Sequence, residues 1–165
     1  MDAANHFETP TTMLLTRLEW LAALAVSITL ALLHVSEINW AVFIGLFVII
    51  DVIGYIPGAI AFRRSGDHRI GRGYYLAYNT MHSLITGGAI AGAWALAFGP
   101  EWALLAIPIH LFGDRGIFGN SLKPFGVPFE PHPVPEFTRF EQAYNAGRPE
   151  PAASEPRRVA HGAGS

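Results

Sequence analysis

The segment AVFIGLFVIIDVIGYIPGAIAF, residues 41–62, decides the fold class because it is long, almost wholly apolar and interrupted by one charged residue, Asp51. A helix that crosses a membrane needs about 20 consecutive, mostly apolar residues. The whole chain of 165 residues has only 15% charged residues, where a soluble domain has about 25%. Its mean hydropathy is +0.30. We therefore predict an integral membrane protein. Because the chain has no cysteine, disulfides and thiolate metal sites are excluded.

Four segments approach the length of a membrane span, and turn-forming residues separate them. They lie at about residues 13–33, 38–62, 74–98 and 102–118, and the last is short and broken by Pro108. The pattern predicts an all-α fold, a bundle of four transmembrane helices. The chain then divides into an N-terminal cytoplasmic segment, a membrane domain and a Pro-rich cytoplasmic tail, at residues 1–12, 13–119 and 120–165.

The first span has one alternative, which is a signal peptide with Arg17 as its charged start. Glu19 lies inside the apolar run, and no convincing small-residue cleavage site follows His34. These two features favour a membrane span.

The distribution of positive charge predicts the orientation in the membrane. An even number of spans places both termini and the loop at residues 63–73 on the same side. All 11 Lys and Arg residues lie on that side. Positive residues mark cytoplasmic loops. We therefore expect a multi-pass membrane protein with both termini in the cytoplasm.

The predicted tail differs in composition from the rest, since it holds eight of the twelve prolines. Residues 135–146, PEFTRFEQAYNA, predict one short helix that begins at a proline. Phe137, Phe140 and Tyr144 then share one face, which suits a helix that lies on the membrane surface. After about residue 147 Pro, Ala, Gly and Arg dominate, and we predict disorder.

Polar side chains from all four predicted spans reach the same depth. At a rise of 1.5 Å per residue, they lie roughly 7–18 Å from the cytoplasmic ends of the spans. An ionisable residue near the bilayer centre costs at least about 2.5–3.5 kcal/mol, so such residues are functional candidates. Residues three or four apart also share a helix face. The set comprises Glu19, Asp51, Tyr55, Asn79, His82, His110 and Asp114.

This set predicts a metal site. His110 and Asp114 are four residues apart, so both can bind one ion from a single helical turn. Imidazole and carboxylate ligands without sulfur suit Zn²⁺, Mn²⁺ or Fe²⁺. The expected cofactor is therefore one divalent metal, which could activate water near the lipid headgroups. The expected ligands are His82, His110, Asp114 and Asp51, with Glu19 as an alternative to Asp51. The residues expected around the ligands are Glu19, Tyr55, Asn79 and Ser83.

Two other interpretations of the polar set stay open. The groups can pair across helices and fix the register of the bundle without binding a ligand. Alternatively, His82 and His110 could hold a haem, because they lie at matching depth on consecutive antiparallel helices. Asp51, Asp114 and the glycine-rich packing expected of the third span argue against a haem, which needs room and an apolar pocket.

Five arginines near the cytoplasmic side are expected to bind anionic lipid headgroups, at about 1 kcal/mol for each residue near the surface. They are Arg63, Arg64, Arg69, Arg72 and Arg115. The expected partners are membrane lipids and, in a membrane complex, other membrane subunits. We expect no nucleic-acid partner.

Four motifs carry a resemblance to a known family: RLEWLAAL (17–24), YNTMHS (78–83), HLFGDRGIFGN (110–120) and LKP (122–124). In this order they resemble an uncharacterised family of small four-span bacterial membrane proteins, a domain family of unknown function. The resemblance covers about residues 15–124. It implies the fold and a location in the bacterial plasma (inner) membrane, but no activity.

A weaker similarity links the chain to membrane-bound metal-dependent hydrolases of the inner membrane. The matching residues are His82, Ser83, His110 and Asp114. Met81 stands where those hydrolases have a threonine, and the only candidate for their second histidine is His68. Two classes of function follow. One is a metal-assisted hydrolase of a lipid or lipid-linked substrate, and the other is a non-catalytic accessory or binding subunit whose polar cluster is structural.

The predicted orientation can be tested with reporter fusions at Gly66 and after Ser165. Both sites follow stretches that contain the positive residues, so both reporters should give a cytoplasmic signal. A fusion in the predicted outer turn at Gly99 serves as the control and should give a periplasmic signal. A periplasmic signal at either of the first two sites would contradict the orientation.

Overall fold

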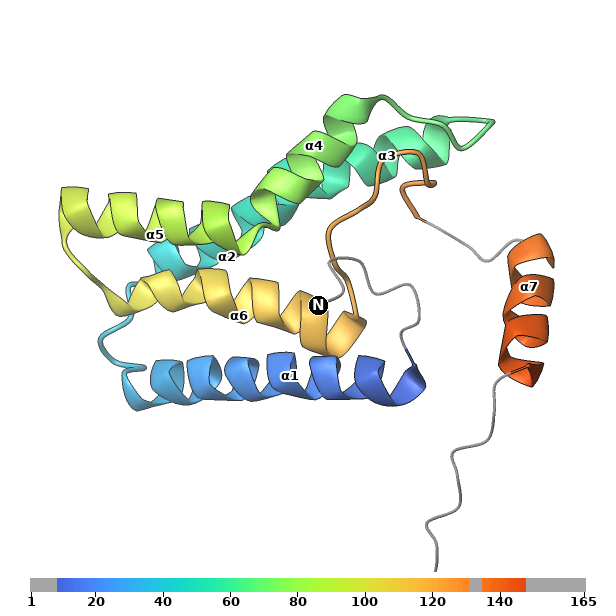
Figure 1. The fold of residues 1–165 in the computed structure, drawn as a ribbon. Helices are drawn as coiled ribbons and strands as arrows, with labels where there is room; N and C mark the ends of the chain where they lie inside the picture. The colour runs from blue at the N-terminus through green and yellow to red at the C-terminus, as the bar shows by residue number, and fades with distance from the viewer. Residues whose placement is uncertain (1–8, 131–134, 148–165) are drawn as a thin grey trace, which may run out of the picture. The chain divides into compact units, whose positions relative to one another are not determined.

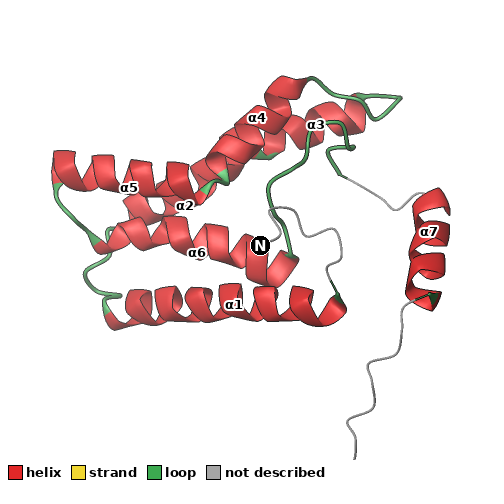
Figure 2. Cartoon of the chain, in the orientation of Figure 1, coloured by secondary structure: helices red, strands yellow, loops and turns green. Residues whose placement is uncertain are grey.

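The computed structural model describes residues 9–130 and 135–147, and all regular structure in these ranges is helical (Figures 1 and 2). The prediction of an all-α chain is confirmed. The chain forms two compact units, residues 1–131 and 132–165. The first unit contains every candidate site residue and is described first.

Helix α1 (Pro10–Leu33) runs along α6 (Ala106–Gly113) and the turn that follows it (Figure 1). The helix starts at a capping box, in which Thr9 and Thr12 satisfy each other's backbone N–H groups. Most of its apolar side chains face outward; Leu33, for example, is 71% exposed. This outer surface matches the lipid-facing side of a membrane helix.

Helices α2 (Trp40–Gly54) and α3 (Ile56–Arg64) continue each other through a slight irregularity at Tyr55. The Tyr55 amide still donates to the carbonyl of Asp51, at 2.9 Å. Pro57 follows in the first turn of α3, where a missing N–H is tolerated. Together the two helices form one apolar stretch of 25 residues.

Helices α4 (Arg72–Met81) and α5 (Leu84–Phe98) meet at a bend of 56°. The bend occurs at His82 and Ser83, and the Ser83 hydroxyl accepts a hydrogen bond from the amide of Ile85. Ser83 therefore starts α5 as a separate helix, because its side chain satisfies one of the first free amides. His82 lies at the point where the chain changes direction.

By length and composition, two helices can cross a membrane: α1 and the combined α2–α3. The bent pair α4–α5 makes a third candidate if it is one broken span. The predicted fourth span is divided into a 3₁₀ turn η1 (Trp102–Leu105), α6, and a π-helical turn η2 (Asp114–Phe118). The four-span bundle therefore belongs to the proposal below.

Pro108 was expected to break the last span, but it lies in the first turn of α6. A proline is tolerated there because the first amides of a helix have no intrahelical partner. The regular α-helix is instead limited by the 3₁₀ turn before it and by the π-helical turn after it.

After η2 the chain crosses back over α3 and α4 as an extended segment, residues 119–130, which we term the strap (Figure 1). Gly119 starts it with a left-handed φ of 72°, a conformation that glycine adopts without strain. Phe129, the residue before its end, has 0% exposure and packs among Ala59, Phe62 and two tyrosines of α4. The strap was predicted as part of the tail, and the first compact unit includes it.

In the second unit, α7 (Pro135–Ala146) is the short helix predicted from the sequence, and its existence is confirmed. Phe137 is 53% and Phe140 64% exposed, and the Phe140 ring stacks near that of Tyr144. The predicted disorder after residue 147 lies outside the described residues.

The packing of the strap can be tested with Gly58→Ala. A Cβ at residue 58 would lie 2.4 Å from Cζ of Phe129 and within 2.9 Å of two more atoms of its ring, which is fully buried. Overpacking of this kind costs about 1–3 kcal/mol. We expect a lower melting temperature in detergent and faster proteolysis within the strap.

Gly88→Ala in α5 is the matched control, because a Cβ there would meet nothing within 4 Å. Its melting temperature should stay at or above that of the wild type. Equal stability of both variants would show that Phe129 does not pack on Gly58.

Candidate metal centre

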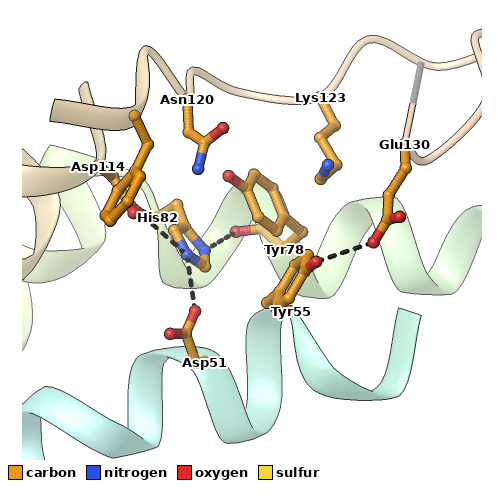
Figure 3. A pocket seen from close by; sticks show the side chains of 9 residues that line it. Asp51, Tyr55, Tyr78, His82, Asp114, Asn120, Lys123 and Glu130 are labelled. Carbon is orange, nitrogen blue, oxygen red and sulfur yellow. Dashed lines mark hydrogen bonds and ion pairs between the residues drawn. The ribbon is translucent and has the colours of Figure 1, made fainter. Parts of the chain in front are cut away.

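His82 is buried at the bend between α4 and α5, and its ring orientation is fixed by the turn before it (Figure 3). Its Nδ1 lies 3.0 Å from the carbonyl oxygen of Tyr78, and the two rings stack with centroids 3.9 Å apart. A carbonyl oxygen only accepts hydrogen bonds, so Nδ1 carries the proton. In the neutral ring Nε2 then presents a lone pair on the opposite side, as in many histidine ligands of metals.

Two carboxylates from different helices face this nitrogen. Asp51 Oδ1 of α2 and Asp114 Oδ2 of η2 each lie 3.3 Å from His82 Nε2. The side chain of Asp114 is 17% exposed, whereas that of Asp51 is 43% exposed. Asp51 is therefore the more open side of the cluster.

His110 contributes a second buried imidazole from α6. Its Nε2 lies 3.7 Å from both Asp51 Oδ1 and Asp114 Oδ2, and the edge of its ring meets Phe47. Among the described residues neither of its ring nitrogens has a hydrogen-bond partner, although both are buried. An unsatisfied buried polar atom costs about 1–3 kcal/mol. A ligand that binds a nitrogen of His110 would remove part of this cost.

The spacing of these atoms fits a shared cation. Two ligands that bind one tetrahedral ion at about 2.0–2.1 Å lie about 3.3–3.4 Å apart. The four nitrogen–oxygen distances of the cluster are 3.3, 3.3, 3.7 and 3.7 Å. Asp51, His82 and His110 offer ligand atoms that all lie within 4.8 Å of one another. Small adjustments of the side chains would bring these atoms into the coordination shell of one ion.

The same nitrogen–oxygen distances fit direct hydrogen bonds between the histidines and the aspartates less well than they fit a shared ion. A charged N–H donor and a carboxylate usually approach to about 2.7–2.9 Å. The single N–H that a protonated Nε2 carries cannot point at two carboxylates at once. The distances of 3.7 Å from His110 are beyond hydrogen-bond range. The arrangement therefore resembles a ligand set more than a network of ion pairs.

The π-helical turn places Asp114 in this cluster. It packs against α1 at Gly116, where a Cβ would come within 3.1 Å of the backbone nitrogen of Leu21. Arg17 of α1 donates to the carbonyls of Gly116 and Ile117, at 3.2 and 2.7 Å. These contacts satisfy carbonyls that the wide turn leaves free, which is consistent with the frequent occurrence of π-turns at functional sites.

Arg115 was predicted to bind lipid headgroups, and the structure shows its guanidinium group in contact with the protein. It donates to the carbonyls of Leu111 and His82, at 3.1 and 2.9 Å, and it lies 5.1 Å from the centre of the Trp20 ring. Arg115 thus links α6, the α4–α5 bend and α1 close to the cluster. The other four predicted headgroup residues are exposed: Arg63, Arg64, Arg69 and Arg72.

The residues predicted to surround the ligands have different places. The Tyr55 hydroxyl donates to Glu130, at 2.8 Å, and Asn79 binds the backbone of the strap. Ser83 starts α5. Glu19 has an exposed side chain on α1, and the described contacts include none between it and the cluster. The structure thus brings together the four predicted ligands and does not place Glu19 with them.

A cavity of about 410 Å³ adjoins the cluster (Figure 3). It is lined on one side by cluster residues and on the other by residues that sequence reasoning missed, namely Tyr78, Phe118, Asn120, Lys123 and Glu130. The last three lie in the strap. The quoted motifs were the only signals of their importance: HLFGDRGIFGN contains Asn120 and LKP contains Lys123. No periodic pattern links the strap to a helix 44 residues earlier.

Comparisons with protein-family models, with curated proteins and with solved structures found no match.

Proposed function

We propose that the protein is a metal-dependent hydrolase of the bacterial inner membrane that acts on a lipid or a lipid-linked substrate. The observation that carries the proposal is the convergence of two buried imidazoles and two carboxylates, from three separate parts of the chain, at the spacing of a metal shell. Zn²⁺, Mn²⁺ and Fe²⁺ suit such ligands. The unpartnered nitrogens of His110 add support, because a bound ion would satisfy one of them.

In this proposal the chain crosses the membrane four times, with both termini in the cytoplasm. The spans are α1, α2–α3, the bent pair α4–α5, and the short element from η1 to η2. Their exposed apolar surfaces suit contact with lipid. The last element is short for a span, and the strap and η2 then lie near the cytoplasmic boundary. Exposed arginines at the same end suit anionic headgroups.

Hydrolysis is the chemistry that such a centre supports best. A divalent ion lowers the pKa of a bound water to about 7, which makes hydroxide available at neutral pH. It also polarises the oxygen of the bond that is attacked. Asp51, with its side chain 43% exposed, lines the cavity together with His82 and would be placed to accept a proton from such a water. The cavity of about 410 Å³ gives a substrate access to the cluster.

The metal can be tested with the purified protein. We expect close to one divalent ion per chain in protein purified without chelator, and at most a tenth of this in His110→Ala and Asp114→Asn. The first variant removes an imidazole ligand, and the second replaces a carboxylate by a neutral amide, whereas Zn²⁺, Mn²⁺ and Fe²⁺ favour imidazole and carboxylate ligands. Elemental analysis measures the metal. Chelation should lower the melting temperature of the wild type and leave that of the variants unchanged, because a ligand stabilises the state that binds it.

His34→Ala is the control for the metal measurement. This histidine follows the C-terminal end of α1, where it pairs with Glu37 and stacks on Trp102. It should keep the full metal content. A metal content below about a tenth of an ion per wild-type chain, with no response to added metal, would reject the metal site. The cluster would then be structural, as in a non-catalytic accessory or binding subunit.

The activity can be tested separately from the metal. The metal-loaded protein in nanodiscs made from bacterial total lipid extract should release a water-soluble or fatty-acid product that mass spectrometry detects. His110→Ala should reduce the release at least 100-fold, by loss of the ion that supplies the nucleophile. Metal binding without product release from any lipid class would reject hydrolysis and favour a binding subunit.

A further inference from the structure

Among the described residues that line the cavity beside the cluster, Lys123 of the strap is the one Lys or Arg. Its side chain enters the cavity between Asn120 and Glu130 (Figure 3). The ammonium group lies over the faces of Phe129 and Tyr78, with Nζ 4.3 and 4.8 Å from the ring centres. Aromatic faces stabilise a cation without neutralising it.

The charge of Lys123 has no carboxylate partner within 4.0 Å in the described part of the chain. Its Nζ donates one hydrogen bond, to the carbonyl of Phe129 at 2.5 Å. An ammonium group has three donors, so two are left for a ligand. Burial lowers the pKa of Lys123 below its usual value, which means that an anion in the cavity would relieve a real cost.

The backbone of Lys123 is held rigidly relative to the cluster. The Asn79 amide group donates to its carbonyl at 2.9 Å and accepts from its N–H at 2.7 Å. Asn79 lies three residues before His82 at the end of α4. A second anchor, Tyr75 in the same helix, donates to the carbonyl of Val127 at 2.7 Å. One helix therefore fixes both the lysine and a metal ligand, as a prearranged binding site requires.

We propose, as a step that rests on the proposed function, that this cavity binds the phosphate group of a lipid phosphate ester between the metal centre and Lys123. The charges favour this substrate class. A divalent ion with Asp51 and Asp114 has no net charge, so it would attract an anion weakly. Lys123 adds the positive charge that a phosphate needs, whereas a neutral carboxylic ester would gain little from it.

The remaining lining suits the rest of such a substrate. Tyr55, Tyr78 and Phe118 provide aromatic surface beside the cavity, and Phe118 is itself 71% exposed. Glu130 accepts from Tyr55 at the end away from the histidines, where its negative charge disfavours a second anionic group. One phosphate near Lys123, with an apolar lipid portion directed outward, fits this distribution.

The reaction then balances as a hydrolysis. The oxygen of a water molecule, activated by the ion that the cluster would hold, would form a bond to phosphorus, and the bond between phosphorus and the lipid alcohol oxygen would break. The alcohol oxygen leaves with the electron pair and takes up the proton that the water lost. The products are a lipid alcohol and inorganic phosphate, or a phosphate monoester if the substrate was a diester. No oxidant, reductant or further co-reactant is needed.

The test uses the metal-loaded full chain in detergent and two ligands, inorganic phosphate and dihexanoyl phosphatidate. Both should raise the melting temperature of the wild type, and phosphatidate should act at a lower concentration if the site is built for a lipid ester. Lys123→Gln should weaken both effects about 10-fold or more, as expected for loss of a charge-assisted hydrogen bond. Lys123→Arg should restore much of the affinity, because it keeps the charge.

Arg139→Gln on α7 is the matched control, since it removes an exposed cation that pairs with Glu136 and is not among the residues that line the cavity. It should respond like the wild type. Metal content and melting temperature without ligand show whether Lys123→Gln remains folded. Release of phosphate from phosphatidate should fall in Lys123→Gln mainly through a higher KM, with the metal retained.

Several outcomes would overturn the inference while the proposed function stands. One is a metal-loaded wild type that phosphate and phosphatidate do not stabilise. Another is an equal response of the wild type and Lys123→Gln. A third is release of fatty acid rather than phosphate, because the enzyme would then be a carboxylic-ester hydrolase. Equal potency of the two ligands would identify free phosphate or a soluble ester as the occupant. A purified wild type that contains and takes up no metal would instead reject the proposed function itself.

Discussion

The structure depends on one constraint, which is that two buried imidazoles lie within 3.3–3.7 Å of two partly exposed carboxylates, and the four groups must compensate one another. The Nδ1 proton of His82 is satisfied, because the Tyr78 carbonyl accepts a hydrogen bond from it. This bond also orients the ring so that Nε2 faces the two aspartates. His110 has no such partner among the described residues. Compensation by protein atoms alone is therefore incomplete, and a cation between the four groups would complete it.

The constraint also accounts for where the helices are irregular. Asp51 lies one turn before the break at Tyr55, His82 lies at the 56° bend, and Asp114 opens a π-helical turn. A regular helix uses its backbone groups internally and points its side chains radially. Breaks release carbonyls, such as those that Arg17 and Arg115 bind, and they let side chains from three helices converge. The irregular elements thus build the cluster, and the long helices support them.

The sequence predicted the all-helical class, the helix at residues 135–146 and the identity of the four clustered residues. It did so because hydropathy, depth along a span and the spacing of His110 and Asp114 are local properties of the chain. The strap could not be predicted, because its hydrogen bonds join Lys123 to a residue 44 positions earlier. Glu19 was misplaced for a similar reason. Depth alone does not determine which face of α1 meets the bundle.

Helix α4 finally connects the two halves of the site. Tyr75 and Asn79 of this helix form hydrogen bonds to the backbone of the strap. Tyr78 lines the cavity, and its carbonyl accepts a hydrogen bond from His82, the residue that follows the helix. Three- and four-residue spacing keeps these side chains on neighbouring faces of one helix. A shift of α4 would therefore move Lys123 and His82 together. The distance between the cation of the strap and the candidate metal ligands is thus set by a single rigid element, which suits the proposed binding of one phosphate between the two.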